Sequence, residues 1–193
     1  MTLTHVLCGF IVSAALSACG PASERRVDET STYSLGHTPS AEQLAALDID
    51  VDSSGHGLPP GQGTAAEGAA VYAQQCATCH GAKGEGVAPA PALVGRTPDA
   101  GYVIAKDGKA TRTIGNYWPY ATTVYDYIRR AMPLNTPGTL TADQTYSLVA
   151  FLLSANGIIA DSLVMNAQSL PAVQMPARKF FVNDNRTGGA GFR

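Results

Sequence analysis

The chain has 193 residues, of which 45% are hydrophobic and 15% are charged, and its formal net charge is −2. This length fits one domain with additional tails, and the apolar content excludes a wholly disordered chain. The near-neutral charge argues against nucleic acid as a partner, because phosphate binding requires a basic surface.

Residues 1–18 predict a signal peptide, with an apolar core at 6–16 that is too short to span a bilayer. The segment that ends at Cys19 resembles the bacterial lipobox, in which the cysteine is lipidated and becomes the first residue. We therefore expect a lipid anchor on Cys19 that holds a periplasmic protein at a membrane surface. Gly20 favours the outer membrane. The alternative is ordinary cleavage near Ala18 and a soluble periplasmic protein.

An irregular region separates this signal from the first strong helix. Residues 19–38 are polar and small, as in a flexible tether. Residues 39–63 form an irregular N-terminal arm, with one short helix over 39–47 capped by Ser40. Closely spaced Asp, Ser, Gly and Pro residues over 48–63 indicate a loop.

Residues 64–157 predict a helical domain with three helices. Their expected ranges are 64–75, 122–131 and 141–156. The first and third open with capping boxes, formed by Thr64 with Glu67 and by Thr141 with Gln144.

Each helix has a predicted buried face. Gly68 and Tyr72 lie one turn apart on the first helix and suit a close helix crossing. The face of the second contains Val124, Tyr127, Ile128 and Ala131, and that of the third contains Tyr146, Val149, Ala150 and Leu153. A turn at 107–108 predicts a small β-hairpin over 102–114. The proline-containing tail, 158–193, is expected to wrap over the domain or a partner.

One Cys-x-x-Cys-His motif is formed by Cys76, Cys79 and His80. Two thiols about one helical turn apart can form thioethers along one edge of a haem, and the adjacent imidazole then reaches the iron. The alternatives are a redox dithiol, a disulfide and half of a zinc site. A redox dithiol favours a strand–helix context, whereas these cysteines end a helix, and zinc needs a second pair of ligands. We expect one covalently bound haem c.

A haem iron that carries electrons needs two protein ligands. His80 would supply one, so a further residue must supply the sixth ligand. No histidine follows His80 in the sequence. Met132 is the favoured candidate, because it follows a predicted helix and precedes Pro133 in a rigid loop. The alternatives are Met175, Met165, His37, His56 and an open position. The ordinary role of any methionine is to fill the core.

The order of these features resembles class I cytochrome c: helix, Cys-x-x-Cys-His, proline-rich loop, helix, Met-Pro loop and helix. The resemblance implies a mainly α fold around one haem, with the first and third helices crossing. It also implies that a proline carbonyl accepts a hydrogen bond from the His80 imidazole and that a leucine two residues later packs on the porphyrin. Pro91 and Leu93 match these positions, and Pro89 is the alternative for the carbonyl.

A narrower resemblance covers residues 39–186 and concerns the cytochrome subunits of bacterial sulfite and sulfane dehydrogenases. The matching segments, in order, are 48–51, 57–61, 113–122, 126–133, 169–171 and 175–176. The resemblance implies that a partner subunit with a molybdenum cofactor oxidises the sulfur compound and that this chain accepts the electrons. The lipobox is a departure, since many relatives are soluble, and 102–109 resembles an insertion.

Two further groups have both a functional and an ordinary interpretation. Trp118, and less strongly Tyr117 and Arg112, lie where the haem propionates could accept hydrogen bonds, whereas a single Trp is also a common core residue. Arg129 and Arg130 are candidates for docking an acidic partner, and solvated helix-end residues are the alternative.

These features predict a periplasmic, lipid-anchored electron-transfer cytochrome that has no catalytic residues of its own. It would accept electrons one at a time from a molybdenum dehydrogenase and pass them to a downstream cytochrome c or oxidase of the respiratory chain. The alternatives are a general membrane-tethered shuttle for another dehydrogenase or an oxidase, a haem sensor or peroxidase with an exchangeable sixth ligand, and an interaction module with a structural haem.

Overall fold

In the computed structural model of the protein, the described residues are 36–95 and 111–182. The chain divides into a unit of residues 1–40 and a unit of residues 41–193. The described part of the first unit, 36–40, contains neither helix nor strand. The predicted signal peptide and Cys19 lie outside the described residues. Within the described ranges, no helix combines the length and apolar character that crossing a membrane requires.

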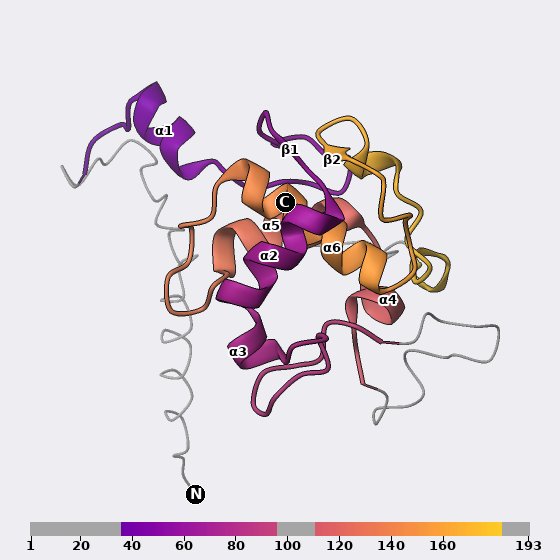
Figure 1. The fold of residues 1–193 in the computed structure, drawn as a ribbon. Helices are drawn as coiled ribbons and strands as arrows, with labels where there is room; N and C mark the ends of the chain where they lie inside the picture. The colour runs from indigo at the N-terminus through magenta and orange to yellow at the C-terminus, as the bar shows by residue number, and fades with distance from the viewer. Residues whose placement is uncertain (1–35, 96–110, 183–193) are drawn as a thin grey trace, which may run out of the picture. The chain divides into compact units, whose positions relative to one another are not determined.

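The second unit is mainly helical (Figure 1). In chain order its elements are α1 (Ala41–Leu47), β1 (Gln62–Gly63), α2 (Ala65–Gln75), α3 (Ala77–His80), α4 (Ile114–Tyr117), α5 (Ala121–Ala131), α6 (Ala142–Ala155), β2 (Met165–Asn166), and the short 3-10 helices η1 (Leu170–Ala172) and η2 (Arg178–Phe180). The helices predicted from the sequence correspond to α1, α2, α5 and α6, whereas α3 and α4 are single turns.

Reciprocal hydrogen bonds start α2 and α6, as the sequence predicts. The Thr64 hydroxyl accepts the Glu67 N–H, and the Glu67 carboxylate accepts the Thr64 N–H. Thr141 and Gln144 repeat this arrangement at α6. Each box satisfies donors that the first helical turn leaves without intrahelical partners. Both capping boxes are confirmed.

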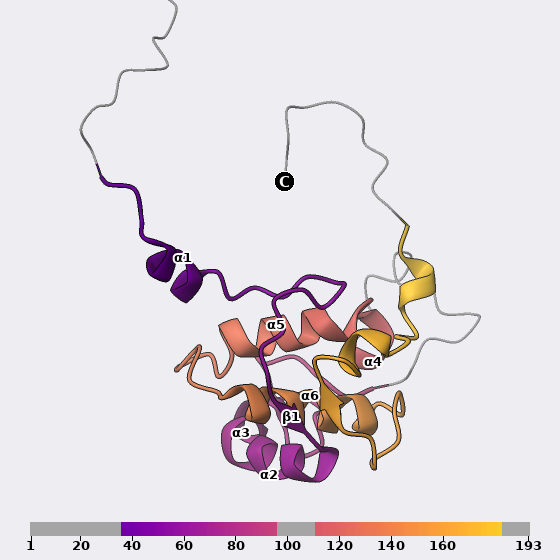
Figure 2. The same ribbon diagram turned by 90° about the horizontal axis from the view of Figure 1, so that it is seen from above.

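The crossing of α2 with α6 forms the centre of the fold (Figures 1 and 2). At Gly68 the two backbones are so close that an added Cβ would lie 1.9 Å from the Ser147 carbonyl oxygen. One turn later, the Tyr72 and Phe151 rings pack with centroids 5.0 Å apart. The predicted small-plus-aromatic crossing is therefore confirmed.

The buried face of α5 differs from the prediction at two positions. Val124, Tyr125 and Ile128 are buried, and the Tyr125 ring packs 4.5 Å from that of Tyr146 on α6. Tyr127, predicted on this face, is 47% exposed, and Ala131, predicted at its end, is only half-buried. The buried stripe follows positions i, i+3, i+4 and i+7 from Ala121, and residue 127 falls on its flank.

The C-terminal segment returns to the helices and forms the only sheet among the described residues. Gln62 of β1 pairs with Asn166 of β2 in an antiparallel register, and Gly63 pairs with Met165. Further along, Leu170 and Met175 are buried in the same core as the helices. The described part of the tail therefore packs on its own domain.

The β-hairpin predicted over 102–114 falls mainly outside the described residues. Its last part is described and is not a strand: residues 111–113 are irregular and α4 begins at Ile114. The reason is local, because the Thr113 N–H donates to the Asn116 side chain at 2.8 Å and so initiates a helical turn.

The N-terminal arm is fastened to α5 by hydrogen bonds. Asp126 accepts the Val51 N–H at 2.9 Å and also binds the Arg130 guanidinium, while Arg129 donates to the Ile49 carbonyl at 3.3 Å. Burial alone would raise the pKa of Asp126, but the hydrogen bonds from Arg130 and Val51 outweigh it and lower that pKa. Both arginines proposed for partner docking thus have contacts within the chain.

Candidate functional site

The Cys-x-x-Cys-His motif lies at the junction of α2 and α3. Cys76 ends α2, with its N–H donating to the Tyr72 carbonyl at 2.9 Å, and the N–H groups of Cys79 and His80 then donate to the Cys76 carbonyl. This single turn places both thiols and the imidazole on one short segment. Cys76 is half-buried and Cys79 is exposed, and both thiols are free.

The imidazole of His80 has a defined orientation. Its Nδ1 lies 2.8 Å from the carbonyl oxygen of Pro91. Because a carbonyl oxygen only accepts hydrogen bonds, Nδ1 carries the proton, and in the neutral ring Nε2 keeps a free lone pair. This arrangement is the one that a metal-binding histidine uses. Of the two candidate prolines, Pro91 makes this contact.

The loop between His80 and Pro91 is folded back by main-chain hydrogen bonds. Gly86 N–H donates to the His80 carbonyl at 2.7 Å, and the N–H groups of Leu93 and Val94 both donate to the Gly84 carbonyl. Gly86 has φ of +82°, and an added Cβ would lie 2.6 Å from the Ala92 nitrogen. The position of the Pro91 carbonyl is therefore set by backbone geometry that only glycine permits readily.

Tyr72 supports the motif in a second way that the sequence did not indicate. Besides packing at the helix crossing, its hydroxyl donates to the Gly81 carbonyl at 2.8 Å, directly after His80. Burial raises the pKa of Tyr72 to about 12, so the donor stays protonated at neutral pH. The signal available in the sequence was its position one turn before Cys76 on α2.

A group of half-buried apolar side chains borders the core. Its members around the motif and the later loops include Cys76, Ala77, Leu93, Val94, Trp118 and Met132. Two free thiols, an imidazole with a free nitrogen and an apolar border are the groups that a covalently attached haem needs. The residues therefore fit haem c.

The structure separates the candidate methionines. Met165 and Met175 are 2% and 5% exposed and belong to the core, which is the ordinary role of the residue. Met132 is half-buried at the C-terminal end of α5, before Pro133, and packs on the edge of the core. His56, another candidate, is exposed in the N-terminal arm, and His37 belongs to the first unit. Among the three methionines in the described residues, only Met132 combines partial exposure with contact to the core.

The aromatic candidates pair with neighbours inside the chain. Trp118 is half-buried and packs edge-to-face on Tyr127, with ring centroids 5.8 Å apart. The Arg112 guanidinium lies 4.8 Å from the centre of the Tyr117 ring, whose other neighbour is Phe181. Propionate binding by these residues stays a prediction.

The other chemistries considered for the motif are poorly supported. Burial, and then the neighbouring Cys79, raise the pKa of the Cys76 thiol to about 11, whereas a redox-active dithiol needs a lowered thiol pKa. In the described part of the chain, no cluster of three or more His, Cys, Asp or Glu side chains could hold a metal ion. The two free thiols beside an imidazole oriented by the Pro91 carbonyl favour haem attachment over a dithiol or a zinc site.

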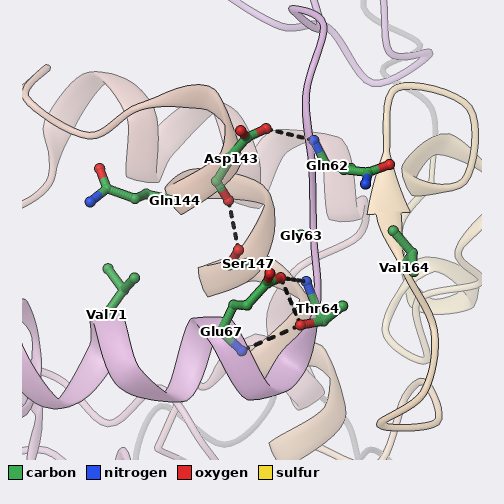
Figure 3. Close-up of a pocket in the computed structure, with 9 residues that line it drawn as sticks. All are labelled: Gln62, Gly63, Thr64, Glu67, Val71, Asp143, Gln144, Ser147 and Val164. Atoms are coloured by element: carbon green, nitrogen blue, oxygen red, sulfur yellow. Dashed lines mark hydrogen bonds between the residues drawn. The ribbon is translucent and has the colours of Figure 1, made fainter.

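An open pocket of about 350 Å³ lies between β1, α2 and α6, away from the motif (Figure 3). Its polar groups already bind one another: Asp143 accepts the Gln62 N–H at 2.8 Å, and Glu67 accepts from Thr64. The Ser147 hydroxyl donates to the Asp143 carbonyl. These groups hold the helix starts and the strand together, and the pocket is structural.

The comparisons with known proteins agree with this site. The family model for cytochrome c matches residues 65–156. The crystal structure of the sulfane dehydrogenase SoxCD from Paracoccus pantotrophus contains a chain that is 39% identical, with a TM-score of 0.70. That match covers 80% of this chain and 74% of the other. None of the curated proteins matches the sequence.

Proposed function

The chain belongs to the cytochrome c family, and from this premise we propose that it accepts electrons in the periplasm from a molybdenum dehydrogenase acting on sulfite or a related sulfur compound. Electron transfer is the activity of the family. The choice of partner rests on one observation, the 39% identity to a chain of a sulfane dehydrogenase over most of both chains.

The roles proposed for the residues follow from their geometry. Cys76 and Cys79 would form the thioethers, His80 would bind the iron through Nε2, and Met132 would supply a sulfur ligand. Leu93 would pack on the porphyrin. When bound, haem c supplies a centre that gains and loses one electron, and a methionine ligand raises its reduction potential. The Pro91 carbonyl would fix the His80 ring by accepting a hydrogen bond from its Nδ1–H, with 2.8 Å between Nδ1 and the oxygen.

The proposed reaction of the partner fixes the electron count. Oxidation of sulfite takes an oxygen atom from water and yields sulfate, two protons and two electrons. A chain that carries one electron must therefore be reduced twice in each turnover. The bond-forming chemistry belongs to the partner, and this chain passes the electrons to a downstream cytochrome c or oxidase.

The N-terminal arm offers a surface for this partner. On α1, no residue is buried, and Leu44 and Leu47 are 53% and 83% exposed. The arm is nevertheless held in place after α1, because Val51 is buried and bonded to Asp126. Exposed leucines on a helix that is anchored at Val51 suit a protein interface, and we propose that the dehydrogenase binds at α1.

The proposed location is the periplasmic surface of a membrane. Cytochrome c domains typically act outside the cytoplasm, and the lipobox-like segment ending at Cys19 would supply the anchor. Palmitate labelling of the full chain, compared with the Cys19→Ala variant, tests the anchor, which requires label on the wild type only.

The decisive experiment measures haem reduction by sulfite with the full-length protein, with and without its candidate molybdenum partner. We expect fast reduction only with the partner, and slower reduction with Leu47→Glu. The matched control is Leu163→Glu, at an exposed leucine of the tail (46%), which should behave as wild type. No acceleration by a partner that is active with an artificial acceptor would overturn the proposal in favour of a general shuttle.

A further inference from the structure

The side-chain amide of Asn156 joins separate segments at the end of α6. Its Nδ2 donates to the Leu152 carbonyl at 2.7 Å and to the Leu93 carbonyl at 3.2 Å. Its Oδ1 accepts the Gly95 N–H at 3.1 Å. The residue is 5% exposed, so these bonds lie away from water, where loss of a partner is costly.

The segment held by Asn156 carries the carbonyl group that orients His80. Pro91 lies two residues before Leu93, and its carbonyl oxygen is 2.8 Å from the His80 Nδ1. The Leu93 N–H is fixed by the Gly84 carbonyl at 2.7 Å, and the Leu93 carbonyl also accepts the Ile114 N–H at 3.1 Å. Asn156 therefore completes the attachment of this segment to the helices.

The neighbouring helix leaves space for the amide. An added Cβ at Gly115, in α4, would lie 2.6 Å from Oδ1 of Asn156 and 3.1 Å from its Cγ. Gly115 does not have a positive φ, so the absence of a side chain there serves the close approach to Asn156 rather than the backbone conformation.

We propose that Asn156 is a positioning residue for the haem-ligand imidazole. Its amide holds residues 93–95, which place the Pro91 carbonyl. This carbonyl accepts a hydrogen bond from the His80 Nδ1–H and so makes Nε2 a stronger donor to iron. A stronger donor favours the ferric state and lowers the reduction potential. The inference rests on the proposed role of His80 as an iron ligand.

The Asn156→Asp substitution is nearly isosteric and reverses the interaction. It replaces the Nδ2 donor by an oxygen that faces the carbonyl oxygens of Leu93 and Leu152, so the 93–95 segment is repelled. We expect faster solvent exchange of the His80 Nδ1 proton, measured by NMR on the reduced, haem-loaded full chain. The new carboxylate is itself an anion that lowers the reduction potential, so the potential is measured in Gly115→Ala. This variant displaces the same amide without adding a charge, and we expect it to show faster proton exchange together with a higher reduction potential. If Asn156→Asp fails to fold, Gly115→Ala carries the test.

The matched control is Asn166→Asp. The Asn166 side chain also accepts backbone N–H groups, those of Gln168 and Ser169, but in the tail. Asp at this position can still accept both N–H groups, so we expect the variant to keep the wild-type stability, potential and proton exchange.

Two outcomes overturn the inference. One is wild-type proton exchange in both variants, with a wild-type potential in Gly115→Ala, when their melting temperatures fall; this would make the amide a purely structural bond. The other concerns the wild-type protein: an NMR spectrum in which the His80 ring signals are not shifted by the haem would show that His80 is not an iron ligand. The first result leaves the proposed function intact, and the second contradicts the residue roles proposed for it.

Discussion

The helical frame, made of α2, α5 and α6, and the motif rim, made of residues 76–95 with Met132, are held together by different forces. In the frame, Tyr146, Val149 and Leu153 are fully buried against neighbouring side chains. In the rim, Leu93 and Met132 are half-buried, and the chain is fixed mainly by main-chain hydrogen bonds. The frame supplies stability through packing, and the rim carries the free thiols, the oriented imidazole and the half-buried apolar side chains that are proposed to hold the haem.

The largest expected effect is on the frame, at the crossing of α2 and α6. Gly68→Leu places side-chain atoms where a Cβ alone would lie 1.9 Å from the Ser147 carbonyl oxygen. We expect the free energy of unfolding to fall by roughly 3 kcal/mol or more, at the upper end for overpacking. Chemical denaturation measures it, with Ala70→Leu, at an exposed position of α2, as the control. Equal stability of the two variants would contradict the packing argument.

The second prediction compares two methionines, one in each region. Met175→Ala, in the core, should lower stability by about 2–5 kcal/mol and leave the haem spectrum unchanged. Met132→Ala should lower the reduction potential and open the iron to carbon monoxide. The reverse assignment, with the spectral change in the Met175 variant, would place the sulfur ligand in the tail.

The third prediction concerns the arm that is fastened to α5. The lowered pKa of Asp126 means that its contribution is complete above about pH 4, its unfolded value, and disappears as the pH falls through the folded value. Asp126→Asn should cost about 1–2 kcal/mol at pH 7 and much less at low pH, as expected for charge-assisted hydrogen bonds. A cost independent of pH, measured by denaturation across this range, would contradict the assignment.

The smallest effect is expected at the start of α6. Thr141→Ala removes the hydroxyl that accepts the Gln144 N–H and should cost about 1 kcal/mol. The haem spectrum should not change, because the capping box belongs to the frame. Thr136→Ala, at an exposed position outside the helix, is the control in thermal denaturation.

The sequence predicts those features whose interacting residues lie close together along the chain. The capping boxes at Thr64 and Thr141 and the small-plus-aromatic face at Gly68 are local patterns that the sequence predicts, whereas the partner helix of that face follows from the resemblance to class I cytochrome c. The pairing of β1 with β2 joins segments about a hundred residues apart and has no local pattern, so it was not. The sequence predicts Tyr127 on the buried face of α5 because helical periodicity indicates that a stripe of residues is buried but does not fix which residue lies at the centre of that stripe. For Asn156 the sequence predicts only the end of a helix, because its hydrogen-bond partners at residues 93 and 95 are distant in the sequence.

The most direct test of an electron carrier with both axial positions filled is an optical redox titration of the full-length protein, with and without carbon monoxide. We predict one covalently bound haem that titrates in a single one-electron step, is low-spin in both oxidation states and does not bind carbon monoxide. A high-spin spectrum with ready carbon monoxide binding by the wild-type protein would contradict this account and favour a haem sensor or peroxidase.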